Sequence, residues 1–202
     1  MINIKTMQYS YNLPSRNIDI NSYIIFSNSS YIAIDPCDTA AIKRFLKNKK
    51  LNAIFLTHGH WDHLLATAEC SAKYNCKVYC SENIIKKLND SYLNCSQNHN
   101  LDLTFDLPKE KLLFISNNDI ITIGDINIEV ISFQGHSDCS VLYKIENNFF
   151  VGDSIFNNRI VHTDLPTSNN ALWKKNINNF KSKYKDKKIF IYPAHGHPFL
   201  FR

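Results

Sequence analysis

Four residues of the types that bind metal ions stand within six positions of the chain, and this cluster restricts the fold more than any other feature. The string Thr-His-Gly-His-Trp-Asp-His over 57–63 directly follows an apolar run over 53–56 that is typical of a buried strand. Imidazole and carboxylate are the usual ligands of a catalytic zinc-type ion. In an extended loop His58 and His60 point the same way, while Asp62 and His63 can face a second ion from the next helix. The alternative, in which one histidine is a capping or core residue, is weaker.

Further candidate ligands follow the ends of three other predicted strands. His136 comes after a strand that ends at 133, Asp153 after one that ends at 151, and His195 after one that ends at 192. Four of the five glycines (59, 135, 152 and 196) adjoin candidate ligands, as expected where a side chain would obstruct an ion or strain the backbone. The whole set offers five histidines and two aspartates, which is enough for two ions with a shared carboxylate.

The chain alternates between strand and helix patterns without an internal repeat, a Pro-rich linker or a low-complexity block. Strands are predicted over 18–26, 31–34, 53–56, 77–79, 120–123, 126–133, 140–145, 149–151 and 189–192, and helices over 39–49, 63–74, from 81 and over 168–180. The polar stretch 91–110 predicts a loop-rich insertion, and Asn147-Asn148 predicts a tight hairpin turn. Strands with helices between them in both halves predict a layered α/β architecture, which we interpret as a single domain over 1–202.

Composition limits the classes of protein to which the chain can belong. Of its 202 residues, 44% are hydrophobic and 20% are charged, which excludes a wholly disordered chain, a collagen-like rod and a coiled coil. No stretch approaches the ~18 apolar residues of a membrane helix, and the first residues show no signal-peptide pattern. The six cysteines form no Cys-x-x-Cys pair, so we expect reduced thiols in a cytoplasmic protein.

Two lysine-rich stretches, 43–50 and 174–188, supply most of the net charge of +5. Each also carries apolar residues at helical spacing, which predicts the solvated face of an amphipathic helix. A patch for nucleic acid or another anionic partner is the weaker alternative. We therefore expect a small-molecule substrate, with neither a membrane nor nucleic acid as the partner, and the oligomeric state stays open.

The order of the candidate motifs resembles that of the metallo-β-lactamase superfamily. His-x-His-x-Asp-His is followed by Gly-His, then Gly-Asp, then His-Gly-His, and the resemblance covers about 18–197. The segments 150–156 and 164–166 are similar to the glyoxalase II-like branch of compact hydrolases. The resemblance implies a four-layer αββα sandwich with the metal ions at one edge, between two sheets.

The resemblance also implies a role for each candidate residue. His58, His60 and His136 would hold the first ion, Asp62, His63 and His195 the second, and Asp153 would bridge both. His197 is similar to a family position that is less regularly occupied. His99 and His162 are interpreted as ordinary polar residues outside this set, although His162 stands where the family has an arginine before Thr-Asp-Leu-Pro.

Departures from the family pattern narrow the substrate class. Asp153 in place of a cysteine disfavours the β-lactamases with a cysteine ligand, and His60 in place of a glutamate disfavours the flavodiiron oxygen reductases. Cys139 occupies a position that the family usually fills with glycine, and we interpret it as a small packing residue. The sequence stops at Arg202 without the C-terminal helical domain that grips glutathione in true glyoxalase II. Glutathione thioesters are therefore not the expected substrate.

We interpret the chain as a metal-dependent hydrolase with a binuclear centre of two divalent ions. Zinc is the expected metal, and iron and manganese are the alternatives. A bridging hydroxide held by the ions and Asp153 would attack an ester, thioester or similar acyl carbon, and Asp62 would help to orient it.

Three other functions remain as alternatives. A persulfide dioxygenase-like oxidoreductase would use one iron held by two histidines and one aspartate. A phosphodiesterase or nuclease on the same fold would show salt-sensitive affinity for nucleic acid. A non-catalytic binding module is disfavoured because the ligand set is complete.

Overall fold

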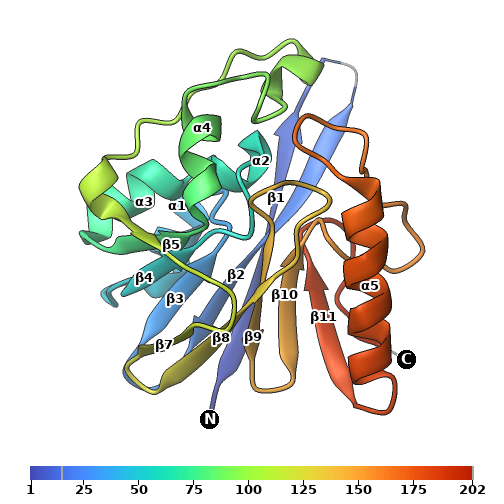
Figure 1. Ribbon diagram of the computed structural model, residues 1–202. Helices are drawn as coiled ribbons and strands as arrows, with labels where there is room; N and C mark the ends of the chain where they lie inside the picture. Colours follow the sequence, from blue (N-terminus) through green and yellow to red (C-terminus); the bar gives the residue numbers. More distant parts are fainter. Residues whose placement is uncertain (15, 202) are drawn as a thin grey trace.

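Two mixed β-sheets pack face to face, with helices on both outer faces, in a computed structural model that describes residues 1–14 and 16–201 (Figure 1). Within this part of the chain each sheet has six strands. The first sheet contains, in spatial order, β1 (Asn3–Asn12), β2 (Asn17–Phe26), β3 (Tyr31–Ile34), β4 (Ala53–Phe55), β5 (Lys77–Cys80) and β6 (Leu112–Phe114). The second contains β12 (Phe199–Phe201), β11 (Ile189–Pro193), β10 (Asn148–Gly152), β9 (Val141–Ile145), β8 (Ile126–Ser132) and β7 (Ile120–Ile123). This is the predicted αββα sandwich.

The helices divide unequally between the two sheets. Four helices lie on the side of the first sheet: α1 (Thr39–Leu46), α2 (Trp61–Leu64), α3 (Thr67–Tyr74) and α4 (Ile85–Leu88). The long helix α5 (Asn170–Tyr184) covers the outer face of the second sheet (Figure 1). Short 3-10 helices span Glu82–Ile84, Ser96–His99 and Lys109–Lys111; the second lies in the predicted insertion over 91–110, and the third overlaps its end. No helix among the described residues is long and apolar enough to cross a membrane.

Three hydrophobic clusters fill the spaces between the four layers. On β2, Ile24 packs toward the helices of the first sheet, whereas the next residue, Ile25, packs between the sheets. On β10, Phe150 packs between the sheets, whereas Phe149 packs against α5. This alternation follows from the two-residue period of a strand and explains why both strands are apolar on both faces.

Parallel pairing brings the candidate site to one edge of the sandwich. β3, β4, β5 and β6 are parallel to one another, as are β10 and β11, so the carboxyl ends of these paired strands meet. The loops that carry chemistry follow these ends, as ligand loops do in open α/β sheets.

Several predicted boundaries need correction. The helix predicted over 39–49 ends at Leu46. The helix predicted over 63–74 is divided into α2 and α3. The break occurs at Ala66, because its amide donates to the carbonyl of Pro36 (3.0 Å) and not to the carbonyl four residues earlier, as it would in a continuous helix. The hairpin turn lies one residue earlier than predicted: Glu146 has the positive φ of 55°, and Asn148 already pairs with Ile145.

The sequence analysis missed three strands, β1, β6 and β12. β1 is a ten-residue edge strand that is rich in polar residues and has no buried side chain, so its pattern lacks the apolar run of a core strand. The two lysine-rich stretches, by contrast, behave as predicted. α1 buries Ile42 and Leu46, α5 buries Ile177 and Phe180, and the lysines of both helices are exposed.

All six cysteines are free and buried, which gives a test of the packing. Burial raises the pKa of Cys37 and of Cys80 to about 12, so their reactive thiolate forms are scarce at neutral pH. We expect the native protein to react slowly with a thiol reagent such as DTNB, and the urea-unfolded protein to react rapidly at all six positions. Fast labelling of several thiols under native conditions would contradict this packing.

Candidate metal centre

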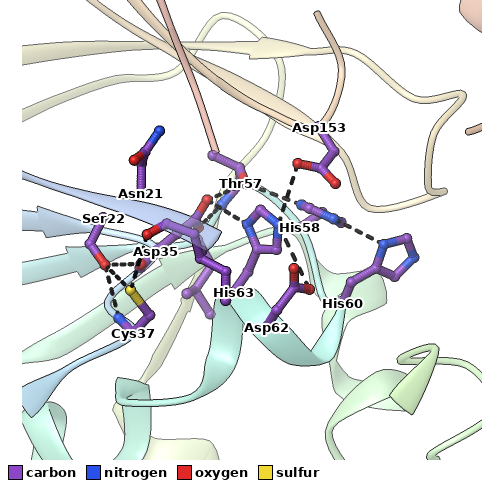
Figure 2. Close-up of polar contacts among 12 residues, drawn as sticks. Asn21, Ser22, Asp35, Cys37, Thr57, His58, His60, Asp62, His63 and Asp153 are labelled. Atoms are coloured by element: carbon purple, nitrogen blue, oxygen red, sulfur yellow. Dashed lines mark hydrogen bonds and ion pairs between the residues drawn. The ribbon is translucent and has the colours of Figure 1, made fainter. Parts of the chain in front are cut away.

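The structure brings all seven predicted ligand residues together at one edge of the sandwich. Figure 2 shows five of them: His58, His60, Asp62, His63 and Asp153. Four come from the loop and helix after β4, and one comes from each of the loops that follow β8, β10 and β11. The four residues after β4 and His136 are buried, whereas Asp153 and His195 are partly exposed. The complete set is His58, His60, Asp62, His63, His136, Asp153 and His195.

Three histidines form a first group with the geometry of a metal site. The Nδ1 atom of His60 lies 3.0 Å from Nε2 of His58 and 3.0 Å from Nε2 of His136. One proton on His60 cannot satisfy two nitrogens, so hydrogen bonding alone does not explain this convergence. A tetrahedral ion about 2.0–2.1 Å from each nitrogen would hold neighbouring nitrogens about 3.3 Å apart. The group therefore fits a zinc-type ion.

Contacts on the outer side of the rings of His58 and His136, and of His195 at the second ion site, determine which of their nitrogens faces an ion. His136 Nδ1 donates to the carbonyl of His162 (2.7 Å), and His195 Nδ1 donates to the carbonyl of Asp19 (2.6 Å). His58 Nδ1 lies 3.1 Å from Thr57 Oγ1, whose proton goes to Asp35. Because a carbonyl only accepts, the rings carry their proton on Nδ1 and keep the Nε2 lone pair for an ion.

A second group contains Asp62, His63 and His195, with Asp153 between the two groups. His195 Nε2 lies 3.2 Å from Asp62 Oδ2, and His63 Nε2 lies 3.5 Å from Asp153 Oδ1. The other Asp153 oxygen lies 3.6 Å from His195 Nε2 and 3.8 Å from His136 Nε2 of the first group. His63 Nε2 and Asp153 Oδ1 are buried without a hydrogen-bond partner among the described residues. Such atoms are expected where a metal ion completes the site.

The charges of the second group balance one another. Burial alone would raise the pKa of Asp62, but His63 and His195 lower it to about 2. Burial would lower the pKa of His195, but Asp153 and Asp62 raise it to about 9. In the first group, burial and the neighbouring histidines lower the pKa of His58. The first group therefore offers neutral imidazoles that can bind an ion directly. In the second group, protonated histidines would release their protons when an ion binds.

Comparison with known proteins gives the family. A model of the metallo-beta-lactamase superfamily matches residues 17–195. The chain belongs to this superfamily. It is 32% identical over 159 residues to the probable metallo-hydrolase YqgX of Bacillus subtilis, an alignment that covers 76% of this chain and 74% of the relative. It is 29% identical to a hydroxyacylglutathione hydrolase of Dictyostelium discoideum, covering 69% of this chain but only 49% of that protein.

The fold agrees with solved structures of the superfamily. The crystal structure of BLEG-1 B3 metallo-beta-lactamase superposes with a TM-score of 0.82 at 28% sequence identity, covering 96% of this chain and 94% of that one. Members of the superfamily bind divalent metal ions, and the histidine-rich groups of this chain are suited to that role.

Sequence reasoning missed Asp35, a buried residue that supports this superfamily site. One of its carboxylate oxygens accepts from the Thr57 amide (2.8 Å), and the other accepts from Thr57 Oγ1 (2.6 Å) and His63 Nδ1 (2.8 Å). A carboxylate behind an imidazole orients the ring and strengthens it as a ligand. The signal was present, because Asp35 directly follows the strand predicted over 31–34, but its partners Thr57 and His63 lie more than 20 residues further along the chain.

Replacing Asp35 by asparagine tests this support. The amide nitrogen of Asn cannot accept from His63, so we expect affinity for the second ion to fall roughly 10–100-fold, with a smaller effect on the first. Metal content after dialysis against graded chelator concentrations measures both affinities. Asp106→Asn, at an exposed position in the insertion, is the matched control. Equal metal retention in both variants would show that Asp35 has no role in orienting His63.

Lys87 of α4 is a buried cation beneath the first group, and its side chain is 1% exposed. Its Nζ lies 3.2 Å from Asp138 Oδ1, 2.7 Å from Thr167 Oγ1 and 3.4 Å from the Leu93 carbonyl, which come from three separate loops. Its stem lies against Gly59, where an added Cβ would come within 2.6 Å of Lys87 Cδ. A buried charge is costly unless it is paired, so these contacts hold the surrounding loops to one another.

Replacing Lys87 by methionine should therefore disturb the first group. We expect affinity for the first ion to fall about tenfold and the visible absorption of the cobalt-substituted protein to change, because the loops that carry His60 and His136 lose their common partner. Lys86→Met, an exposed neighbour on the same helix, is the control. An unchanged cobalt spectrum and affinity in Lys87→Met would show that the side chain only fills space.

The remaining histidines and Cys139 lie outside both groups. His99, His162 and His197 line a cleft of about 1060 Å³ that opens onto the site. Cys139 is buried and accepts a hydrogen bond from the Gly59 amide (3.2 Å). Burial raises the pKa of this thiol, which agrees with a packing role rather than a reactive one.

Proposed function

We propose that the chain is a hydrolase that uses two divalent metal ions, with zinc as the first choice, to cleave an ester, thioester or similar acyl bond. The observation that carries the proposal is the position of Asp153, whose carboxylate lies within 4 Å of histidines from both groups. His58, His60 and His136 would hold the first ion, Asp62, His63 and His195 the second, and Asp153 would bridge them.

The bound ions would lower the pKa of a water molecule to roughly 7 and polarise a substrate carbonyl. Asp62 and Asp153 are ionised at neutral pH, because the adjacent histidines hold both pKa values below their usual range despite burial. Their carboxylates can therefore accept a proton or orient a nucleophile beside the scissile bond.

The described cleft lining offers neither a hydroxyl nucleophile nor a reactive thiol. It contains no serine or threonine, and its one cysteine is Cys95, whose pKa burial raises to about 11. An acyl-enzyme on a hydroxyl or thiol of this lining is therefore disfavoured, and attack by water is the supported route.

The comparisons favour acyl substrates over nucleic acid. One relative is named a probable metallo-hydrolase and another a hydroxyacylglutathione hydrolase, which supports placing the chain near the glyoxalase II-like members. The lysine-rich helices α1 and α5 contribute no residue to the described cleft lining, which contains no lysine. We further propose a single domain and a cytoplasmic location, since six free, buried thiols fit a reducing compartment.

The test is metal analysis combined with a substrate panel. We expect two ions per chain in zinc-loaded protein and turnover of aryl esters or small thioesters. Asp153→Ala should lower occupancy of the second ion and reduce kcat/KM by more than about 100-fold, because a negative charge between two cations is lost. Asp106→Ala, at an exposed position, should change neither quantity.

Two results would favour the alternatives instead. One iron per chain with oxygen consumption would indicate a persulfide dioxygenase-like oxidoreductase. No acyl turnover, together with salt-sensitive binding of RNA or DNA, would indicate a nuclease. Full occupancy and normal turnover in Asp153→Ala would show that Asp153 does not bridge the ions.

A further inference from the structure

We propose that the cleft selects acyl substrates that carry a second, anionic group, a carboxylate or a phosphate, and that Arg16 and Arg159 bind this group. The inference rests on the proposed function, because the acyl bond would lie at the metal centre while the anionic group lies toward the two arginines. Both arginines line the cleft of about 1060 Å³.

The cations that line the described part of the cleft are arginines and not lysines. The chain has 19 lysines and only four arginines. The described cleft lining nevertheless contains two arginines and no lysine. A guanidinium presents its donors in a planar fork that matches the two oxygens of a carboxylate or phosphate, whereas an ammonium is a point charge.

The two guanidinium groups come from separate loops that converge on the cleft. Arg16 lies in the turn between β1 and β2, where its carbonyl accepts from the Leu13 amide (2.9 Å). Arg159 lies in the long loop between β10 and α5. Together with burial, the charge of Arg16 lowers the pKa of His99, another cleft residue, which agrees with a position of Arg16 on the cleft wall.

Neither arginine forms an ion pair with a carboxylate among the described residues. The acids that line the cleft are Asp62 and Asp153, which face histidines, and Asp19. By contrast, the buried Lys87 has its carboxylate partner in Asp138. The two positive charges at the cleft are therefore available to a ligand.

Apolar side chains beside the arginines would accept the carbon skeleton of such a substrate. Trp61, Phe156 and Leu165 line the cleft, and so does Ile160, which is 85% exposed next to Arg159. A large apolar side chain this exposed at the mouth of a cleft gains most from being covered by a ligand. The lining thus matches a substrate with a carbon body, one acyl bond and a separate anionic end.

The inference is tested by comparing kcat/KM for a charged ester with kcat/KM for a matched neutral ester. The probes are para-nitrophenyl hemisuccinate, its neutral methyl ester, and the phosphonate analogue in which phosphonate replaces the free carboxylate. We expect zinc-loaded protein to prefer the hemisuccinate over the methyl ester by about tenfold in kcat/KM, a preference that falls toward one in Arg16→Gln/Arg159→Gln. A general loss of activity cancels in this ratio, and the phosphonate shows which anion binds better. Arg44→Gln, an exposed arginine of α1 outside the described cleft lining, should keep the preference.

A binding measurement without metal ions gives an independent readout. Succinate should bind to metal-free protein, as followed by tryptophan fluorescence, about tenfold more weakly in the double variant than in the parent or in Arg44→Gln. Equal turnover of the charged and neutral esters, or an unchanged preference in the double variant, would overturn this inference and leave the proposed function standing. Arginine-dependent succinate binding without any ester turnover would refute the proposed function instead.

Discussion

Hydrogen bonds between the two sheets at a single edge determine the geometry of the candidate metal centre. The backbone N–H of Asn21 on β2 donates to the carbonyl of Ala194 after β11 (2.7 Å), and the Asn21 side chain donates to the carbonyls of Pro193 and Gly196. At the start of β9, the Val141 amide donates to the carbonyl of Thr57 (2.9 Å). Because His58 follows Thr57 and His195 follows Ala194, these bonds set the distance between side chains that belong to different sheets.

Much of this edge could be predicted from the sequence, for a simple geometric reason. The side chains of interest directly follow short apolar runs, and parallel pairing brings the ends of such strands together. The layered fold was predictable as well, since β2 and β10 are apolar on both faces. β1 was not, because an edge strand with exposed polar side chains resembles a loop in its pattern.

The support around the site was harder to predict, because it depends on contacts between distant parts of the chain. Lys87 has the pattern of an ordinary solvated lysine of a helix, yet it bonds to Thr167, 80 residues away. Asp35 resembles a turn residue until the fold brings His63 and Thr57 against it. Local periodicity reports which face of an element is buried, but it does not report which polar group on another loop will meet a buried charge.

The orientation of the imidazoles has a consequence for how the site would bind its ions. His136, His195 and His63 each have Nδ1 bonded to a carbonyl or carboxylate. These contacts come from the protein itself, so the fold determines the direction in which each Nε2 atom points. Rings that the fold has already aimed lose little rotational freedom when an ion binds, so ordering the ligands costs little of the binding free energy.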